Sequence, residues 1–338
     1  MKKRNLLLIG LIVALALMAA ACRPGAPPAA KPYKETQFLM DTIVEMTAYG
    51  PGAENAVKDS FAELKRLHDL TNNFDPASQV SRINQAAGRE KVRVDPDLIA
   101  MLKRSNELAD KLEGTFDLTV GPLTELWGIG RKGDFVPAQA DIDKALSLVN
   151  QRLVAIDAAA GTVYLPKEGM KLDLGGIAKG YAVDKAIAIL KSHGIASALI
   201  NAGGDVRVIG RRPDGNPWRI GVQHPRKADA IIAKLALTEW DTMETSGDYQ
   251  RYIIKDGVRY AHVLDPRTGR QPRQLVSVTM ALNNSADGDI FSTALLILGP
   301  ERGLELLRQF PGVEAIMVAA DGRVIVSPGL EGKAEIEK

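Results

Sequence analysis

Residues 173–184 read DLGGIAKGYAVD, and this stretch decides how the rest of the chain is interpreted. Two glycines, Gly175 and Gly176, precede a helical pattern that contains Lys179. Glycines at the start of a helix let the backbone approach a ligand closely. The free N–H groups of the first helical turn suit an anion such as a phosphate, and Lys179 would add a positive charge on that turn. The alternative is a strand-to-helix turn whose glycines serve packing alone.

This stretch matches neither of the two common phosphate-binding loops. A dinucleotide fingerprint needs Gly-x-Gly-x-x-Gly, whereas residues 175–180 read GGIAKG. A P-loop needs its lysine directly after a glycine and before Ser or Thr, and here Gly180 follows Lys179. The glycine turn alone therefore does not identify a ligand.

Seven stretches, taken together, resemble the ApbE family, the flavin transferases that move FMN from FAD onto a protein threonine or serine. Besides residues 173–184 they are FLMDTIVEMTAYG (38–50), GTFDLTVGPLTELWG (114–128), NAGGDVRVIG (201–210), TSGDYQRY (245–252), HVLDPRTG (262–269) and ADGDIFSTALLILG (286–299). Each stretch by itself is a weak signal. Their common order, over a match from about residue 38 to 326, makes the resemblance specific.

Residues 1–21 are predicted to be a targeting segment. Lys2, Lys3 and Arg4 form a basic start, and residues 6–21 form an apolar run that is shorter than the roughly 20 residues of a membrane span. Cys22, the single cysteine of the chain, follows three alanines. We expect a bacterial lipoprotein signal peptide with acylation of Cys22. A plain cleaved signal is the alternative, because such lipoprotein signals usually carry leucine where this chain has Ala19.

The composition predicts the domain organisation and gives no sign of nucleic-acid binding. Residues 22–35 hold the lipidated cysteine and a Pro/Ala-rich spacer of roughly 30 Å. The net charge is +2, and it becomes −1 once residues 1–21, with three basic and no acidic side chains, are removed. We expect the catalytic body over residues 36–328, with a possible lobe boundary near residue 170, and a charged tail over 329–338.

Periodicity predicts an α+β fold of antiparallel β-sheets with flanking helices. Apolar alternation predicts one half-buried strand over residues 36–49, and residues 72–84 have the character of a loop. Helical spacing predicts four helices, over 53–70, 95–112, 176–193 and 286–298, and a short one after Pro300. Hairpins are expected over 153–165 and around 321–322, and strand follows strand from 197 to 277. Helices followed by adjacent strands favour α+β, and the resemblance implies an ApbE-like, T-fold-like body of two lobes.

Asp289 and Thr293 are candidate metal ligands. They lie four residues apart in a predicted apolar helix, so they share one face of it. A buried carboxylate is costly unless it is paired or metal-bound, although an aspartate near a helix start more often serves as a cap. The resemblance implies that Asp289, Thr293 and the backbone carbonyl of Ala178 bind Mg²⁺, a hard ion that prefers oxygen ligands. Asp287 lies near the same helix start, which leaves open which carboxylate binds.

His262 is the candidate acid–base residue. It stands at the end of a predicted strand, directly before the turn at residues 265–269. The residues alone favour a packed, hydrogen-bonded histidine over a base, and they favour Asp265 as an Asx cap of the turn. The resemblance implies that His262 and Asp289 are catalytic, with an acid–base or positioning role for the histidine.

The resemblance also implies which residues line the FAD pocket. From the residues alone, Trp127 would be a core residue, and the segments around Asp205 and Ser246 would be a turn and a bulge. The implied set is Met40, Phe116, Asp117, Trp127, Gly175, Gly176, Lys179, Asp205, Ser246, Gly247, Asp248 and His262.

The expected activity follows from the resemblance. It implies an extracytoplasmic, membrane-anchored enzyme that uses Mg²⁺, cleaves FAD, joins FMN through a phosphoester to a threonine or serine of a target protein, and releases AMP. The expected target is a subunit of a membrane electron-transport complex, and the N-terminal lipid would bring the enzyme to the membrane. Two alternatives stay open: a Mg²⁺-dependent FAD pyrophosphatase, and a lipoprotein that binds a flavin or another solute without chemistry.

Overall fold

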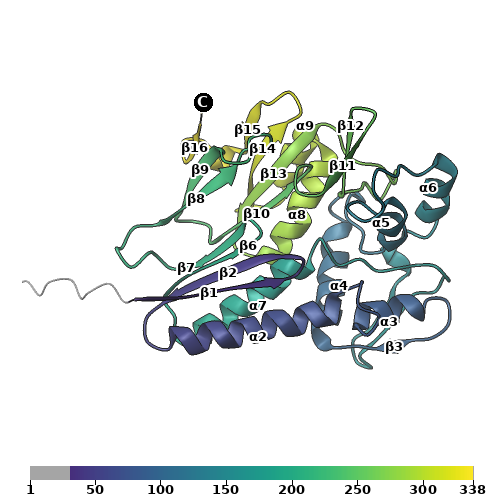
Figure 1. Cartoon of the computed structure of the whole chain (residues 1–338), viewed down its shortest axis with the longest axis horizontal. Coiled ribbons are helices and arrows are strands. Elements are labelled where there is room, and N and C mark those ends of the chain that lie inside the picture. Colours follow the sequence, from purple (N-terminus) through teal and green to yellow (C-terminus); the bar gives the residue numbers. More distant parts are fainter. Residues whose placement is uncertain (1–30, 338) are drawn as a thin grey trace, which may run out of the picture. The chain divides into compact units, whose positions relative to one another are not determined.

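An eight-stranded antiparallel sheet carries the structure, a computed structural model that describes residues 31–337 (Figure 1). Its strands lie in the order β1-β2-β6-β7-β10-β13-β14-β15. They are β1 (Pro32–Leu39), β2 (Thr42–Tyr49), β6 (Ser197–Ala202), β7 (Asp205–Ile209), β10 (Thr242–Gly247), β13 (Leu275–Leu282), β14 (Glu314–Ala319) and β15 (Val324–Val326). The residues from Pro32 onward form one compact unit, and the lobe boundary near residue 170 stays a prediction.

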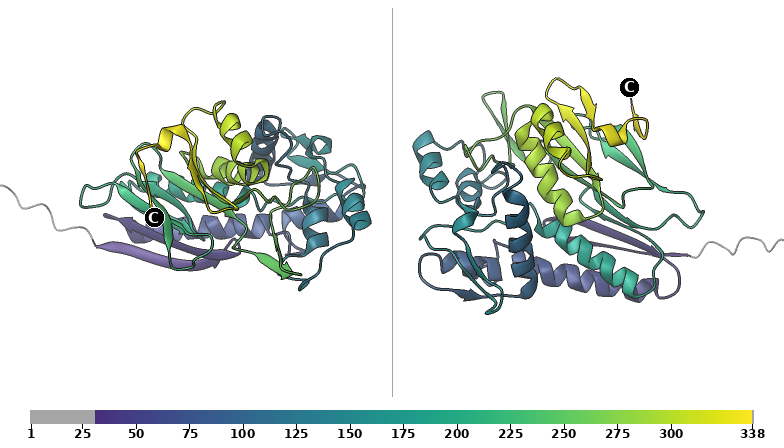
Figure 2. Two further views of the ribbon diagram at one scale, coloured as in Figure 1. Left: turned by 90° about the horizontal axis from the view of Figure 1, so that it is seen from above. Right: turned by 180° about the vertical axis from the view of Figure 1, so that it is seen from behind.

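Three helices cover one face of this sheet: α2 (Ala53–Thr71), α7 (Ala178–Ser192) and α8 (Ser285–Leu298). Figure 2 shows them together on that face. Helix α2 buries Val57, Phe61 and Leu64. These residues are three or four positions apart, so their side chains lie on one face of the helix. Helix α8 is buried on nearly all sides, in keeping with its apolar sequence. The larger core of the molecule therefore lies between these helices and the sheet.

The opposite face of the sheet is covered by a small sheet with the order β16-β9-β8. The strands are β8 (Trp218–Gln223), β9 (Ile231–Leu237) and β16 (Ala334–Ile336). Trp218, Leu235 and Met243 belong to the second core that this contact buries. Where the large sheet is covered on both faces, a polar side chain on it needs a partner.

The remaining elements form smaller groups around the sheet. They are α3 (Gln79–Gln85), β3 (Val92–Arg93), α4 (Pro96–Ala109), α5 (Gly121–Trp127), α6 (Gln139–Leu146), η1 (Gln151–Leu153), β4 (Ala155–Asp157), β5 (Thr162–Tyr164), β11 (Tyr252–Lys255), β12 (Val258–Ala261), α9 (Pro300–Leu307) and η2 (Pro328–Leu330). Strands β3, β5 and β4 form one sheet, and β11 pairs with β12 in a separate hairpin.

The single strand predicted over residues 36–49 is wrong, because the chain reverses direction within it. Met40 and Asp41 adopt positive φ angles of 54° and 60°, so a two-residue turn joins β1 to β2. In the resulting register Phe38 lies opposite Ile43, and both side chains are exposed. The two-residue turn shifts the inward-facing positions from odd numbers in β1 (Leu39) to even numbers in β2 (Val44, Met46), which alternation along one strand does not reveal.

The loop predicted over residues 72–84 is also partly wrong, because α3 begins within it. Ser78 accepts a hydrogen bond from the N–H of Ser81 (3.0 Å) and so caps the helix. The buried residues of this short helix include Val80 and Ile83, three apart. Helices α5 and α6 were not predicted either.

Most of the other predictions agree with the structure. The four longer predicted helices correspond to α2, α4, α7 and α8, the strand-rich region 197–277 contains β6 to β13, and the antiparallel α+β class is confirmed. The ordered body is longer than expected, because β1 begins in the predicted spacer and β16 lies in the predicted tail. The signal peptide and Cys22 lie outside the described residues. Within residues 31–337, none of the helices combines the length and the apolar character that a membrane crossing needs.

Helices α7 and α8 touch at Gly180, and this contact positions the candidate site. A Cβ atom at Gly180 would lie 2.1 Å from the carbonyl oxygen of Ser285, so only glycine fits there. One turn further along α7, the carboxylate of Asp184 accepts the N–H groups of Ser285 (3.0 Å) and Ala286 (3.0 Å). Asp184 also pairs with Arg207 of β7. These contacts fix the start of α8 against α7 and the sheet.

Candidate active site

Four charged side chains meet where the first turn of α7 faces α8 and the sheet. The ammonium of Lys179 contacts Asp205 and lies 2.7 Å from Asp289 Oδ1 and 3.5 Å from Glu244 Oε2. The three carboxylates are buried, and their oxygen atoms lie within 4.8 Å of one another. We call Lys179, Asp205, Glu244 and Asp289 the acidic cluster. If all four ionise, it carries more negative than positive charge.

Strand alternation explains why these carboxylates point to the helices. Asp205 starts β7 and Glu244 is the third residue of β10, while their neighbours Val206 and Met243 belong to the core on the opposite face. Successive side chains of a strand point to opposite faces. Both carboxylates therefore lie on the helix-covered face, where Asp289 of α8 reaches them.

Burial and charge act in opposite directions on the groups of the acidic cluster. Burial raises the pKa of Glu244 to about 7, although the Lys179 ammonium acts to lower it and Asp289 to raise it. Burial acts to lower the pKa of Lys179, but the carboxylates of Asp289 and Glu244 outweigh it and hold that pKa above its ordinary value. The lysine thus remains an ammonium among the carboxylates.

The helix start does not offer the free N–H groups that the glycine turn suggested. The N–H groups of Ile177 and Ala178 donate to the carbonyl of Leu174 (3.1 and 2.9 Å), and that of Gly180 donates to Asp289 Oδ2 (2.7 Å). Lys179, predicted to sit beside a phosphate, instead pairs with carboxylates. The expectation that the N–H groups of this turn are free is therefore wrong, whereas the predicted role of Lys179 and of the glycines in FAD binding stays a prediction.

A group of small hydroxyl side chains lies beside the acidic cluster. Ser246 Oγ is 2.8 Å from Ser292 Oγ and 3.3 Å from Thr293 Oγ1. A Cβ atom at Gly176 would lie 2.8 Å from the ring of Phe116 and 3.8 Å from Thr293 Oγ1. The structure thus brings the predicted residues Gly176, Phe116, Ser246 and Thr293 together at the start of α7.

The two candidate aspartates of α8 have different surroundings. Asp287 binds Arg104 of α4 through two hydrogen bonds of 2.7 and 2.6 Å. Asp289 points to the acidic cluster and accepts from Lys179 and Gly180. Asp289, and not Asp287, thus shares a face of α8 with Thr293 beside the first turn of α7, which contains Ala178.

His262 belongs to a second group of contacts, around the β1–β2 turn. Its N–H donates to the carbonyl of Arg251 (3.0 Å), and Arg251 pairs with Asp41 (2.7 Å) next to Met40. Burial, together with the positive charge of Arg251, lowers the pKa of His262 to about 4, although the backbone hydrogen bond to Arg251 and the charge of Asp173 act to raise it. Asp173 Oδ1 also accepts the N–H of Gly175 (2.9 Å). The carboxylate that acts to raise the pKa of His262 thus belongs to the glycine turn.

Three residues predicted to line the FAD pocket make structural contacts. Asp117 accepts from Thr119 and from the N–H of Gln151 (2.9 Å). Trp127 is buried in a separate apolar cluster, where its Nε1 donates to the carbonyl of Gly269 (2.9 Å). Asp248 forms a two-bond pair with Arg226 (2.6 and 2.7 Å), and Gly247 stands before it at the end of β10. These contacts alone explain the three polar groups, and a role in FAD binding stays a prediction.

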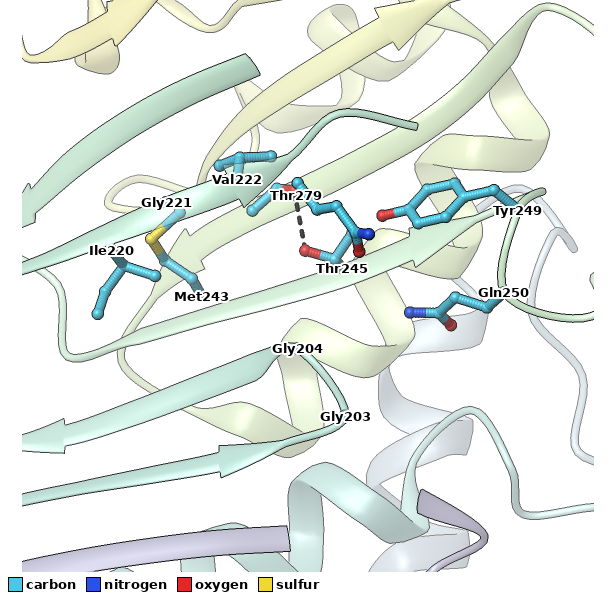
Figure 3. Close-up of a pocket in the computed structure, with 11 residues that line it drawn as sticks. Gly203, Gly204, Ile220, Gly221, Val222, Met243, Thr245, Tyr249, Gln250 and Thr279 are labelled. Atoms are coloured by element: carbon cyan, nitrogen blue, oxygen red, sulfur yellow. Dashed lines mark hydrogen bonds between the residues drawn. The ribbon is translucent and has the colours of Figure 1, made fainter. Parts of the chain in front are cut away.

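A pocket opens on the other face of the large sheet. It lies between β8, β10 and the turn at Gly203 and Gly204, and the side chains of Tyr249 and Gln250 point toward it (Figure 3). Thr245, on its wall, faces away from the helices, since Glu244 beside it faces them. The acidic cluster therefore lies across the sheet from this pocket. The candidate site is the cluster, because its charged groups, and not the residues of the pocket, offer metal and phosphate chemistry.

Comparison with known proteins identifies the family. The sequence pattern of the ApbE family matches residues 40–317. The chain belongs to the ApbE family. It is 39% identical over 297 residues to the FAD:protein FMN transferase of Klebsiella pneumoniae (strain 342), covering 87% of this chain and 92% of the relative. It is 31% identical over 346 residues to that of Treponema pallidum (strain Nichols), covering 97% and 95%.

Solved structures of ApbE proteins share the fold. The ApbE protein of Thermotoga maritima superposes with a TM-score of 0.83 at 33% identity, covering 90% of this chain and 99% of that one. The flavin transferase ApbE of Vibrio cholerae gives a TM-score of 0.80 at 28% identity, with coverage of 90% and 99%. The predicted family, fold class and enzyme class, a flavin transferase, are confirmed by these similarities.

Glu244 is the residue of this ApbE chain's acidic cluster that sequence analysis missed. It stands directly before the TSGDYQRY stretch, and a lone glutamate in a strand gives no functional signal. Its burial, to 1% exposure, is the informative property, because a buried glutamate needs a partner. That property follows from the pairing of β10 with β7 and β13, which the sequence does not show.

The low pKa of His262 predicts a pH-dependent stability. The unfolded chain binds a proton at this side chain near pH 6.5 and the folded chain only near pH 4. The contribution of His262 is therefore complete above about pH 6.5 and falls as the pH drops towards 4. Denaturant unfolding of wild type and His262→Gln across this range should show the wild-type advantage shrinking with pH. A constant difference would contradict the lowered pKa of the folded imidazole.

Proposed function

We propose that this protein is a Mg²⁺-dependent FAD:protein FMN transferase. The observation that carries the proposal is the buried acidic cluster at the start of α7, next to the hydroxyl of Thr293. The relatives named FAD:protein FMN transferase support FAD as the substrate and a protein as the acceptor. The hydroxyl of a threonine or serine of the target attacks the phosphorus of the FMN half. The bond from that phosphorus to the bridging oxygen breaks, and AMP leaves.

The charges of the candidate site fit a divalent cation. Three carboxylates surround a single ammonium, so a diphosphate would meet net negative charge there. Glu244 Oε2 accepts no hydrogen bond from any described residue, which leaves a buried oxygen unpaired. Asp289, Thr293 and the carbonyl of Ala178 would hold Mg²⁺, whose preference is for oxygen ligands. The ion, when bound, neutralises charge on the phosphoryl oxygens and acts as a Lewis acid.

The side chains of the protein supply position and charge. Phosphoryl transfers depend mainly on alignment and charge stabilisation, with little covalent chemistry for the protein to perform. The missing side chain at Gly176 lets the ring of Phe116 pack against the start of α7, next to Thr293. Lys179 adds the positive charge closest to Asp289. The hydroxyls of Ser246 and Thr293 offer further polar groups at the same place.

His262 is proposed to assist the acceptor hydroxyl. At neutral pH its imidazole is uncharged, because its pKa lies near 4, so a ring nitrogen is free to accept a proton. Its position beside Arg251, and under the influence of Asp173, connects it with the β1–β2 turn and the glycine turn. We assign it an acid–base or orienting role toward the attacking hydroxyl.

The N-terminus supports an extracytoplasmic location at a membrane. The basic start, the apolar run and Cys22 have the order of a bacterial lipoprotein signal, and the proline-rich segment would hold the enzyme away from the lipid surface. A flavin-bearing subunit of a membrane electron-transport complex is the target that this location favours.

The central test is an assay of the mature protein with FAD, Mg²⁺ and a candidate acceptor protein, followed by mass spectrometry. Covalent FMN on the acceptor, with AMP released, is the expected result. Free FMN plus AMP, with or without acceptor, would indicate a pyrophosphatase. Bound but intact FAD would indicate a binding protein, and would contradict the proposed function.

Asp289→Asn should reduce FMN transfer by at least about 10³, because it removes the one charged group of the proposed ligand set. Asp287→Asn is the matched control on the same helix. It loses a partly exposed pair with Arg104, of the kind worth about 0–1 kcal/mol in stability, and should transfer FMN within about threefold of wild type. Inactive Asp287→Asn with active Asp289→Asn would mean that the metal ligand is assigned to the wrong carboxylate.

His262→Ala should slow FMN transfer by roughly 10²–10⁴, the usual range for an acid–base group. FAD affinity should change by no more than a few-fold, since other loops hold the flavin and adenine. Transfer rate, FAD titration and melting temperature are measured on one preparation. A normal melting temperature together with a wild-type rate would remove His262 from the mechanism. Joint loss of stability and FAD affinity would indicate a packing role.

Cys22→Ser should move the protein, expressed in a bacterial host, from the membrane fraction to the soluble extracytoplasmic fraction. The reason is that serine cannot form the thioether that carries the lipid. Immunoblots of the separated fractions measure the change. Unchanged membrane association would contradict lipid anchoring through this residue.

A further inference from the structure

The ammonium of Lys179 is held asymmetrically by the three carboxylates of the acidic cluster. It contacts Asp205, lies 2.7 Å from Asp289 Oδ1, and is 3.5 Å from Glu244 Oε2. The first two distances are those of charge-assisted hydrogen bonds, and the third is too long for one. Lys179 therefore binds two of its three possible partners.

Asp289 has both carboxylate oxygens occupied in this arrangement. Oδ1 accepts from Lys179, and Oδ2 accepts the N–H of Gly180 at 2.7 Å. A divalent cation that approaches Asp289 meets the ammonium at Oδ1, and the two positive charges repel each other. Binding of a cation to Asp289 thus requires the ammonium to move away.

Glu244 offers the place to which the ammonium can move. Its Oε1 accepts from Thr242 Oγ1 (2.8 Å), whereas Oε2 is buried and accepts no hydrogen bond from any residue of the described chain. Nζ needs to come closer to Oε2 by less than about 1 Å to reach the distance of a charge-assisted bond. Lys179 can then keep Asp205 and exchange Asp289 for Glu244 without leaving the cluster.

We propose that Glu244 is a positioning residue that takes over the ammonium of Lys179 when a divalent cation binds Asp289. This inference rests on the metal site of the proposed function. It assigns to Glu244 the role of holding the lysine, and not that of a metal ligand. The acidic cluster then has two arrangements, with Lys179 on Asp289 or on Glu244, and the cation selects the second.

The test measures the affinity of the mature protein for Mn²⁺ without FAD, by the electron paramagnetic resonance signal of free Mn²⁺. Glu244→Gln should weaken Mn²⁺ binding about tenfold or more, because an amide holds an ammonium less well than a carboxylate does. Lys179→Met should strengthen it, because the competing ammonium is gone. In the Lys179→Met background, Glu244→Gln should change the affinity by less than about threefold.

Several outcomes would overturn the proposal. An equal loss of affinity on Glu244→Gln with and without Lys179 would make Glu244 a direct ligand. Unchanged affinity in Glu244→Gln alone would remove its role. If Glu244→Gln lowers the melting temperature of the metal-free protein too far for measurement, Lys179→Met still decides, since an affinity equal to or weaker than wild type contradicts the competition.

Two further variants separate this proposal from the proposed function. Asp289→Asn should abolish Mn²⁺ binding. Asp287→Asn, on the same helix, should leave Mn²⁺ binding unchanged, because Asp287 pairs with Arg104 of α4. Mn²⁺ affinity that survives Asp289→Asn would refute the metal site itself. Loss of binding in Asp289→Asn, together with wild-type affinity in Glu244→Gln, would refute only the role of Glu244.

Discussion

The close crossing of α7 and α8 at Gly180 is the constraint on which the candidate site depends. The absent side chain lets the backbone of Ser285 approach, and Asp184 binds the N–H groups that begin α8. A larger residue at Gly180 would separate the helices, and overpacking of this kind typically costs about 1–3 kcal/mol. Because Lys179 and Asp289 lie within one turn of the crossing, the same contact sets the distance between their charges.

The acidic cluster is costly for the fold and useful for chemistry. Buried carboxylates need compensation, and one ammonium compensates three of them only in part. An excess of buried negative charge attracts a cation, which is the basis of the proposed metal-dependent transfer. The buried carboxylates that destabilise the fold are therefore the same groups that suit the site to phosphoryl transfer.

Parts of the site were predictable because they depend on local sequence. The spacing of Asp289 and Thr293 places them on one face of a helix, and Gly176 before α7 marks the close approach of the Phe116 ring. The β1–β2 turn was missed, since the two-residue reversal at Met40 and Asp41 carries neither glycine nor proline. The start of α3 was missed although Ser78 is an ordinary helix cap.

The sequence by itself determined the family, the antiparallel α+β class and the helix that carries Asp289, because ordered motifs and periodicity are local properties. Only the tertiary structure decided what Lys179 and Glu244 do. Strand pairing turns Glu244 toward the helices, and the helix crossing brings Lys179 between Asp289 and Asp205. Charge partners are set by distances between segments far apart in the chain. For this reason a lysine that the sequence suggested beside a phosphate is, in the folded protein, paired with the carboxylates of Asp205 and Asp289.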